Sequence, residues 1–175
     1  MNAMNATHIL SVLVVNRPGV LTRVAGLFAR RGYNIESLTV SPTNDPDQSR
    51  MTIGVDVDSP NTLEQIVKQL NKLIEVHKII ELEGTAVARE LILVKVRSTL
   101  ETRSQVIDTV ALFRGKAVDV SPESITVEAT GSREKLDALV KMLEPFGIIE
   151  LVQSGRVALN RGAVALAARG SRNGS

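Results

Sequence analysis

The chain has 175 residues, of which 43% are hydrophobic and 23% charged, a composition typical of a globular protein with one ordinary domain or two small ones. Its 21 basic and 19 acidic side chains are mixed along most of the chain, which argues against a nucleic-acid-binding surface. The sequence contains no cysteine, so disulfides, thiolate metal sites and cysteine nucleophiles are excluded. Neither a signal-peptide pattern nor a membrane-spanning apolar run is visible, and we expect a cytoplasmic protein without membrane contact.

The first half of the chain predicts six elements. A β-branched apolar run is followed by turn residues and then by apolar positions at helical spacing. Two strands come next, and Ser59 and Pro60 provide a capping residue and a first-turn proline for a second helix. The order is strand, helix, strand, strand, helix, strand, over residues 8–15, 20–31, 33–41, 51–57, 60–74 and 76–82.

The same pattern starts again after a boundary at residues 83–85. The second set of elements covers residues 89–97, 106–115, 117–120, 124–129, 132–143 and 148–152. Two split βαβ patterns of about this length fit the ferredoxin-like arrangement. We therefore predict an α+β protein with two tandem βαββαβ units, one within residues 1–83 and one within 84–160, and a flexible tail over 161–175.

The first strand of each repeat is apolar on both faces, although a ferredoxin-like unit places both of its helices on one face of the sheet. A strand with two apolar faces is expected to be covered on both. This pattern predicts an oligomer. Contact between the two repeats alone is the alternative.

No catalytic constellation is visible. His8 and His77 lack a second ligand at metal-binding spacing, so neither is predicted to bind a metal. The paired carboxylates Asp56 and Asp58 fit a solvated strand face better than acid–base chemistry. Phosphate-binding glycine loops and a serine nucleophile elbow are absent from the sequence. RNA-recognition modules share this fold but stack bases on aromatics of central strands, which are missing here.

The most informative segment is the loop at residues 16–21, which joins a strand to the start of a helix. Free backbone N–H groups and the helix dipole favour a carboxylate there. Gly19 permits close approach, the amide of Asn16 both donates and accepts, and Val20 and Leu21 offer an apolar lining. From this motif alone, an amino-acid site and a plain turn with Pro18 in the first helical position are about equally supported.

A longer stretch carries a specific resemblance. Residues 16–28, NRPGVLTRVAGLF, resemble the opening of an ACT domain, the ferredoxin-like module that senses amino acids. Residues 29–40, ARRGYNIESLTV, closely resemble the small subunit of acetolactate (acetohydroxyacid) synthase. Further matching segments cover residues 49–53, 90–96, 113–115 and 118–120. The resemblance identifies the chain as a member of this family, with an ACT domain followed by an ACT-like domain.

The resemblance implies a non-catalytic subunit that binds a larger catalytic subunit. That partner is expected to carry thiamine diphosphate, magnesium and FAD, whereas no cofactor is expected in this chain. The small subunit of this family activates the large one and confers feedback inhibition, commonly by valine, in branched-chain amino-acid biosynthesis. A homodimer is expected, with the effector between protomers.

The family's effector residues are carried over by position. One protomer is expected to contribute four residues and its partner two, namely Asn16, Gly19, Val20 and Leu21 from the first and Asn34 and Ile35 from the second. A solvent-facing position is expected for Arg17, in the same loop.

Two alternatives come from other classes. An acylphosphatase-like enzyme uses this fold with an arginine and an asparagine, which Asn16 and Arg17 superficially match, but it has a single repeat. An ACT-type regulator of transcription or of another enzyme would need a further element that is not visible outside the repeats. Which branched-chain amino acid is preferred does not follow from the sequence, since one methylene changes binding by only about 1–3 kcal/mol.

Overall fold

The computed structural model describes residues 6–82, 84, 86–163 and 165–166. Contacts between Cα atoms divide these residues into two units. The first contains the described residues up to 87 together with those from 156 onward, and the second contains residues 88–155. The domain boundaries expected after residues 83 and 160 refer to units that fold independently. These boundaries remain predictions.

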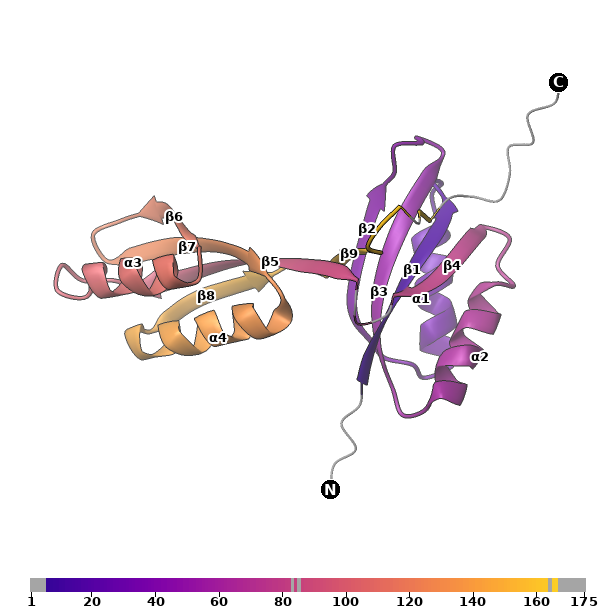
Figure 1. The fold of residues 1–175 in the computed structure, drawn as a ribbon, viewed down its shortest axis with the longest axis horizontal. Helices are drawn as coiled ribbons and strands as arrows, with labels where there is room; N and C mark the ends of the chain where they lie inside the picture. The colour runs from indigo at the N-terminus through magenta and orange to yellow at the C-terminus, as the bar shows by residue number, and fades with distance from the viewer. Residues whose placement is uncertain (1–5, 83, 85, 164, 167–175) are drawn as a thin grey trace. The chain divides into compact units, whose positions relative to one another are not determined.

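The first unit is a four-stranded antiparallel sheet with two helices on one face (Figure 1). The strands lie in the order β2-β3-β1-β4, so β2 and β4 form the two edges of the sheet. The elements in chain order are β1 (Ala6–Val15), α1 (Val20–Arg30), β2 (Ile35–Pro42), β3 (Gln48–Val57), α2 (Pro60–Leu70) and β4 (Val76–Leu82).

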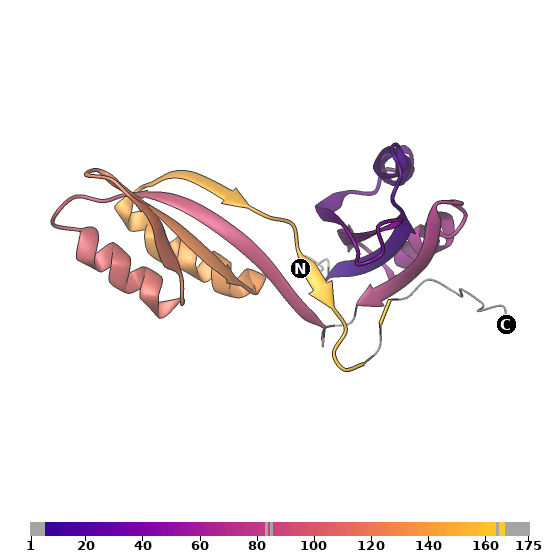
Figure 2. The ribbon, with the colours of Figure 1, turned by 90° about the horizontal axis from the view of Figure 1, so that it is seen from above.

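The second unit repeats this topology, with strand order β6-β7-β5-β8. Figure 2 shows its two helices on the same side of the strands. Its elements are β5 (Val87–Arg97), α3 (Arg103–Leu112), β6 (Lys116–Val120), β7 (Ser124–Gly131), α4 (Arg133–Leu143), the 3-10 turn η1 (Glu144–Phe146) and β8 (Ile148–Gln153). A short strand, β9 (Val157–Leu159), follows. The predicted α+β fold with two βαββαβ units is confirmed.

Each unit has its own apolar core between the sheet and the helices. In the first unit the alternate β1 residues Leu10, Val12 and Val14 are at most 1% exposed and pack with Phe28 of α1. In the second unit the equivalent alternation of β5 is centred on Val94. Full burial of such side chains stabilises the fold by about 1.5–3 kcal/mol each.

The two units share their irregularities as well as their topology. In each sheet the first strand shifts register against the last strand, and the second strand shifts against the third. The first shift lies between Leu13 and Val14 in one unit and between Lys95 and Val96 in the other. The second shift lies between Ile35 and Ser37 and between Ala117 and Asp119. These matched positions align the loop after β1 with the loop after β5.

Helix α3 differs from the expected amphipathic pattern. Val106 and Val110 are buried, but Ile107 is 44% exposed and Leu112 is 78% exposed. The apolar residues of α3 therefore do not form a single inward face. Within the described part of the chain, no helix is both long and apolar enough to cross a membrane.

Candidate functional site at the start of α1

Helices α1 and α3 begin without a side-chain cap, whereas α2 and α4 have one. Ser59 accepts a hydrogen bond from the N–H of Thr62 at the start of α2, and Ser132 accepts one from Lys135 at the start of α4. At α1 the capping position is Gly19, which has no side chain, and the first turn contains no acidic residue. A capping side chain usually contributes about 1 kcal/mol, so its absence needs a reason.

Gly19 adopts a conformation that favours glycine. Its φ is +88°, in the left-handed region, where other residues are strained. A Cβ built on Gly19 would meet no atom within 4 Å, so the space beside the helix start is open. The backbone at this position is therefore accessible to a ligand.

Backbone donors face this open space. Within the described residues, the N–H groups of Leu21 and Thr22 have no hydrogen-bond acceptor. Such groups in the first turn of a helix, together with the helix dipole, favour an anion. The start of α1 is consequently suited to a carboxylate.

Asn16 is held beside the helix start by two loop contacts. Its backbone N–H donates to the carbonyl of Asp47 at 2.8 Å, and its side-chain Nδ2 donates to the carbonyl of Pro46 at 2.9 Å. The amide group is thus oriented by its nitrogen, and Oδ1 is left to accept a hydrogen bond.

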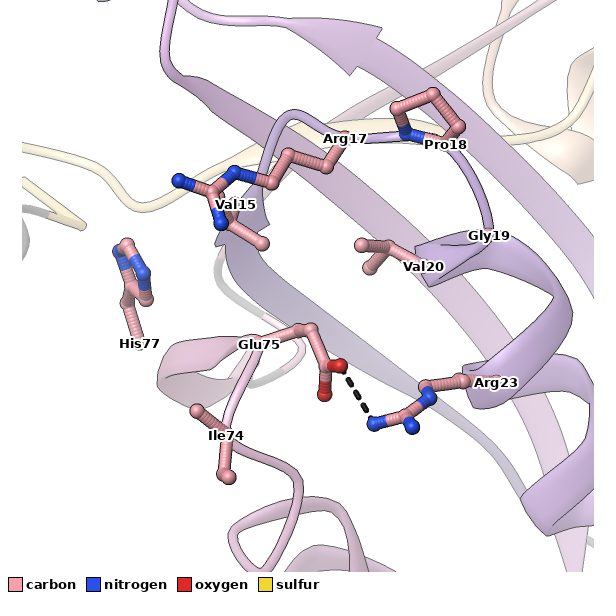
Figure 3. A pocket seen from close by; sticks show the side chains of 9 residues that line it. All are labelled: Val15, Arg17, Pro18, Gly19, Val20, Arg23, Ile74, Glu75 and His77. Atoms are coloured by element: carbon pink, nitrogen blue, oxygen red, sulfur yellow. Dashed lines mark hydrogen bonds and ion pairs between the residues drawn. The ribbon is translucent and has the colours of Figure 1, made fainter.

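A cavity of about 480 Å³ adjoins this loop (Figure 3). Gly19 and Val20 line it, as the sequence predicts for an effector site, whereas Asn16 and Leu21 are outside its lining. Val20 is only 5% exposed, and Leu21 is 44% exposed on the first turn of α1. Further lining residues come from the end of β1, from α1 and from the segment before β4, namely Val15, Arg17, Pro18, Arg23, Ile74, Glu75 and His77.

The wall formed by the segment before β4 was not predicted from the sequence. Arg23 Nη1 lies 2.6 Å from Glu75 Oε1, and Figure 3 shows this pair bridging the cavity wall. Glu75 Oε2 is buried and has no hydrogen-bond partner in the described residues. An acidic residue some 50 positions away carries no local signal of this proximity, which follows from β1 and β4 being neighbours in the sheet.

Arg17 was expected to face solvent, and it is exposed. It also lines the cavity, and no hydrogen bond or ion pair engages its guanidinium within the described residues. This position adds positive charge near the start of α1.

Asn34 and Ile35 lie away from the other predicted effector residues of the same protomer. Ile35 begins β2, and Asn34 immediately precedes it. Strand β2 pairs only with β3 among the described strands, so its other edge is available to a second chain. Of the six predicted residues, two line the cavity, two lie beside these in the chain, and two lie at the start of the edge strand.

The loop after β5 provides an internal comparison. The backbone N–H of Ser98 donates to Glu123 O at 2.9 Å, as that of Asn16 does to Asp47 O. This second loop contains no glycine and no positive φ, and it includes Glu101. Thr99 and Thr102 satisfy each other's backbone N–H groups with their hydroxyls. The loop before α3 is thus held by its own hydroxyl groups, although α3, like α1, has no side-chain cap.

The histidine and carboxylate groups singled out in the sequence lie in separate places in the described structure. No group of three or more histidine, aspartate or glutamate residues there is suited to a metal ion. His8 pairs with Glu81 at 2.8 Å, and Asp56 accepts a hydrogen bond from Thr7 at 2.8 Å.

The fold and the open helix start place the chain among proteins built from two consecutive ACT-type ferredoxin-like units. The family model described as "AHAS small subunit-like ACT domain" matches residues 10–78, and that described as "Small subunit of acetolactate synthase" matches residues 89–162.

Similar proteins agree with these matches. The chain is 61% identical over 158 residues to the acetolactate synthase small subunit of Mycobacterium bovis, covering 89% of this chain and 93% of that protein. It is 53% identical over 159 residues to a probable acetolactate synthase small subunit of Methanothermobacter thermautotrophicus, covering 90% and 94%. The crystal structure of the acetolactate synthase small subunit from Thermotoga maritima has a TM-score of 0.84 and 42% identity, covering 91% and 99%.

The chain belongs to the acetolactate synthase small-subunit family, whose members are regulatory subunits. The match extends over both repeats, so the single-repeat acylphosphatase-like alternative is not supported.

Proposed function

We propose that this chain is the amino-acid sensor of an acetolactate synthase. It binds a branched-chain amino acid, with valine the first candidate, and confers feedback inhibition on a large catalytic subunit that it also activates. The open start of α1 supports this proposal most strongly, because Gly19 leaves space beside backbone N–H groups that have no acceptor in the described residues, whereas threonine hydroxyls occupy the corresponding loop of the second repeat.

The geometry matches the groups of an α-amino acid. The effector's carboxylate accepts from the N–H groups at the start of α1, and Oδ1 of Asn16 accepts from its ammonium group. Val20 and Leu21 supply an apolar surface for the aliphatic side chain. In this proposal a homodimer forms along β2, and Asn34 and Ile35 of the partner complete the site.

The catalytic step belongs to the large subunit. Thiamine diphosphate, magnesium and FAD are assigned to that partner, and this chain carries no cofactor of its own. We place the assembled enzyme in the cytoplasm.

A valine titration of the reconstituted enzyme tests the proposal. Leu21→Ala removes exposed apolar contact area, and Asn34→Ala removes the partner's contribution. Each substitution should remove at least about 1.4 kcal/mol of effector binding, so the valine concentration for half-inhibition should rise about tenfold or more. Activation of the catalytic subunit should persist in both variants.

Leu112→Ala is the matched control, because Leu112 is an exposed leucine on the corresponding helix of the second repeat. Its valine sensitivity should equal that of the unmodified chain. Unchanged valine inhibition in both Leu21→Ala and Asn34→Ala would place the effector elsewhere.

A further inference from the structure

The sheet of the first unit has a second cavity, on the face opposite α1 and α2. Pairing of β1 with β3 sets Ser11 beside Thr52 and Leu13 beside Arg50, out of phase with the core residues Leu10 and Val12. The cavity has a volume of about 210 Å³. Its strand residues are Ser11, Arg50, Ile80 and Leu82.

The other wall of this cavity comes from the end of β9 and the segment after it, through residues that include Leu159, Asn160 and Leu166. Ser11 and Leu13 are each 2% exposed although they point away from the helices. The described part of the segment lies beside Ser11 on a sheet face that the helices leave open.

Buried hydroxyl groups in this region lack partners. Thr39, Thr52 and Ser11 lie side by side across β2, β3 and β1. Ser11 Oγ and Thr39 Oγ1 are both buried without a hydrogen bond in the described residues. An unsatisfied buried hydroxyl is costly and uncommon in native proteins, so Ser11 Oγ at the cavity wall indicates a missing polar partner.

The charge of the cavity is positive. Arg50 is half-buried and forms no hydrogen bond or ion pair in the described residues. Lys78 lies across Leu13 from Arg50 on the same face and is likewise unpaired. No aspartate or glutamate is among the described lining residues. An unpaired guanidinium at the edge of a small cavity is suited to a carboxylate.

The remaining lining is mostly apolar, with Ile80, Leu82, Leu159 and Leu166 around the polar groups. A ligand that fits must therefore be small and combine one carboxylate with a short aliphatic chain. An amino acid fits poorly, because its ammonium group would lie near the unpaired guanidinium of Arg50 with no acidic residue among the described lining residues to offset the repulsion.

We propose that this cavity binds a short aliphatic 2-oxo acid. Arg50 binds the carboxylate, Ser11 Oγ donates to the 2-oxo oxygen, and the amide of Asn160 lies in reach as a second polar group. Ile80, Leu82 and Leu159 contact the alkyl chain. The site is separate from the start of α1 and does not depend on valine binding there. A chain with both sites binds an amino acid and its deaminated counterpart independently.

Calorimetric titration of the full chain with 2-oxoisovalerate tests this assignment. Arg50→Met keeps the apolar stem and removes the charge, and Ser11→Ala removes the unpaired hydroxyl. Each variant should bind 2-oxoisovalerate about tenfold more weakly or worse, since bonds to charged groups are the stronger ones. Arg31→Met, at an exposed arginine at the end of α1 on the helix side of the sheet, should bind as the unmodified chain does.

Valine supplies the second arm of the experiment. Saturating valine should leave 2-oxoisovalerate binding unchanged, and isovalerate, which lacks the 2-oxo group, should bind more weakly and lose little further in Ser11→Ala. Failure of 2-oxoisovalerate to bind in the millimolar range overturns the proposal, as does equal affinity in Arg50→Met and Arg31→Met. Displacement by valine also overturns it, because a shared site would be the effector site. If Arg50→Met fails to fold, the affinity of Ser11→Ala for 2-oxoisovalerate decides the test.

Discussion

At the scale of single residues, two glycines of α1 and its cap have opposite roles. Gly19 has φ of +88°, while Gly26 lies inside the helix, where an added Cβ would make only ordinary contact with the side chain of Arg30. Gly19→Ala should destabilise the chain by about 1–2 kcal/mol, the cost of a left-handed L-residue. Gly26→Ala should stabilise it by about 0.5–1 kcal/mol.

Urea unfolding of both variants measures this contrast. Equal effects of the two substitutions would mean that the α1 loop relaxes to another conformation. Because φ of Gly19 is positive, any side chain placed there is strained, an acidic one included.

The residues of the loop after β1 were visible in the sequence, but the cavity that adjoins this loop was not. Asn16, Gly19 and Val20 lie close enough together in the sequence to indicate a helix-start motif. Glu75 and Arg50 contribute through strand pairing, which brings together residues far apart in the chain. The unpaired hydroxyl of Ser11 follows from burial on the second face of β1, which periodicity indicated only as an apolar run.

At the scale of elements, the capping serines of α2 and α4 allow each unit to be destabilised separately. Ser59 caps α2 in the first unit, and Ser132 caps α4 in the second. Each serine-to-alanine substitution should cost about 1 kcal/mol.

Hydrogen exchange followed by mass spectrometry separates the two effects. Ser59→Ala should speed exchange in α2 and its neighbours, and Ser132→Ala should do so in α4. If either substitution accelerates exchange equally in both units, the two cores unfold as one.

Element order and type were predictable because hydrophobic periodicity was strong in β1, α1, α2 and α4. Helix α3 was the exception in detail. Its apolar residues Ile107 and Leu112 are exposed, since tertiary packing places only Val106 and Val110 against the sheet. The order of the strands within each sheet was predictable from the repeated βαββαβ pattern, and no single strand indicated it.

At the scale of the whole molecule, the first repeat should fold without the second. Its core cluster and the residues packed against it lie between Leu10 and Ile79. A fragment ending at Val87 should therefore melt cooperatively and still bind valine. At 100 times the dissociation constant, valine should add about 2.7 kcal/mol of stability.

The same fragment lacks the segment that contributes Leu159 and Asn160 to the second cavity. It should therefore gain no stability from 2-oxoisovalerate, whereas the full chain should. A fragment that melts normally but ignores valine, beside a full chain that responds, would refute the placement of the effector site.

The bare start of α1 has a consequence for how long the protein survives in a cell. A helix end that lacks about 1 kcal/mol of capping opens more often, and opened chains are the ones that proteases cut. On the proposed function, an effector bound at this end supplies the missing contacts. Saturating amino acid should therefore slow the cleavage of the subunit by a protease, and its removal should speed that cleavage.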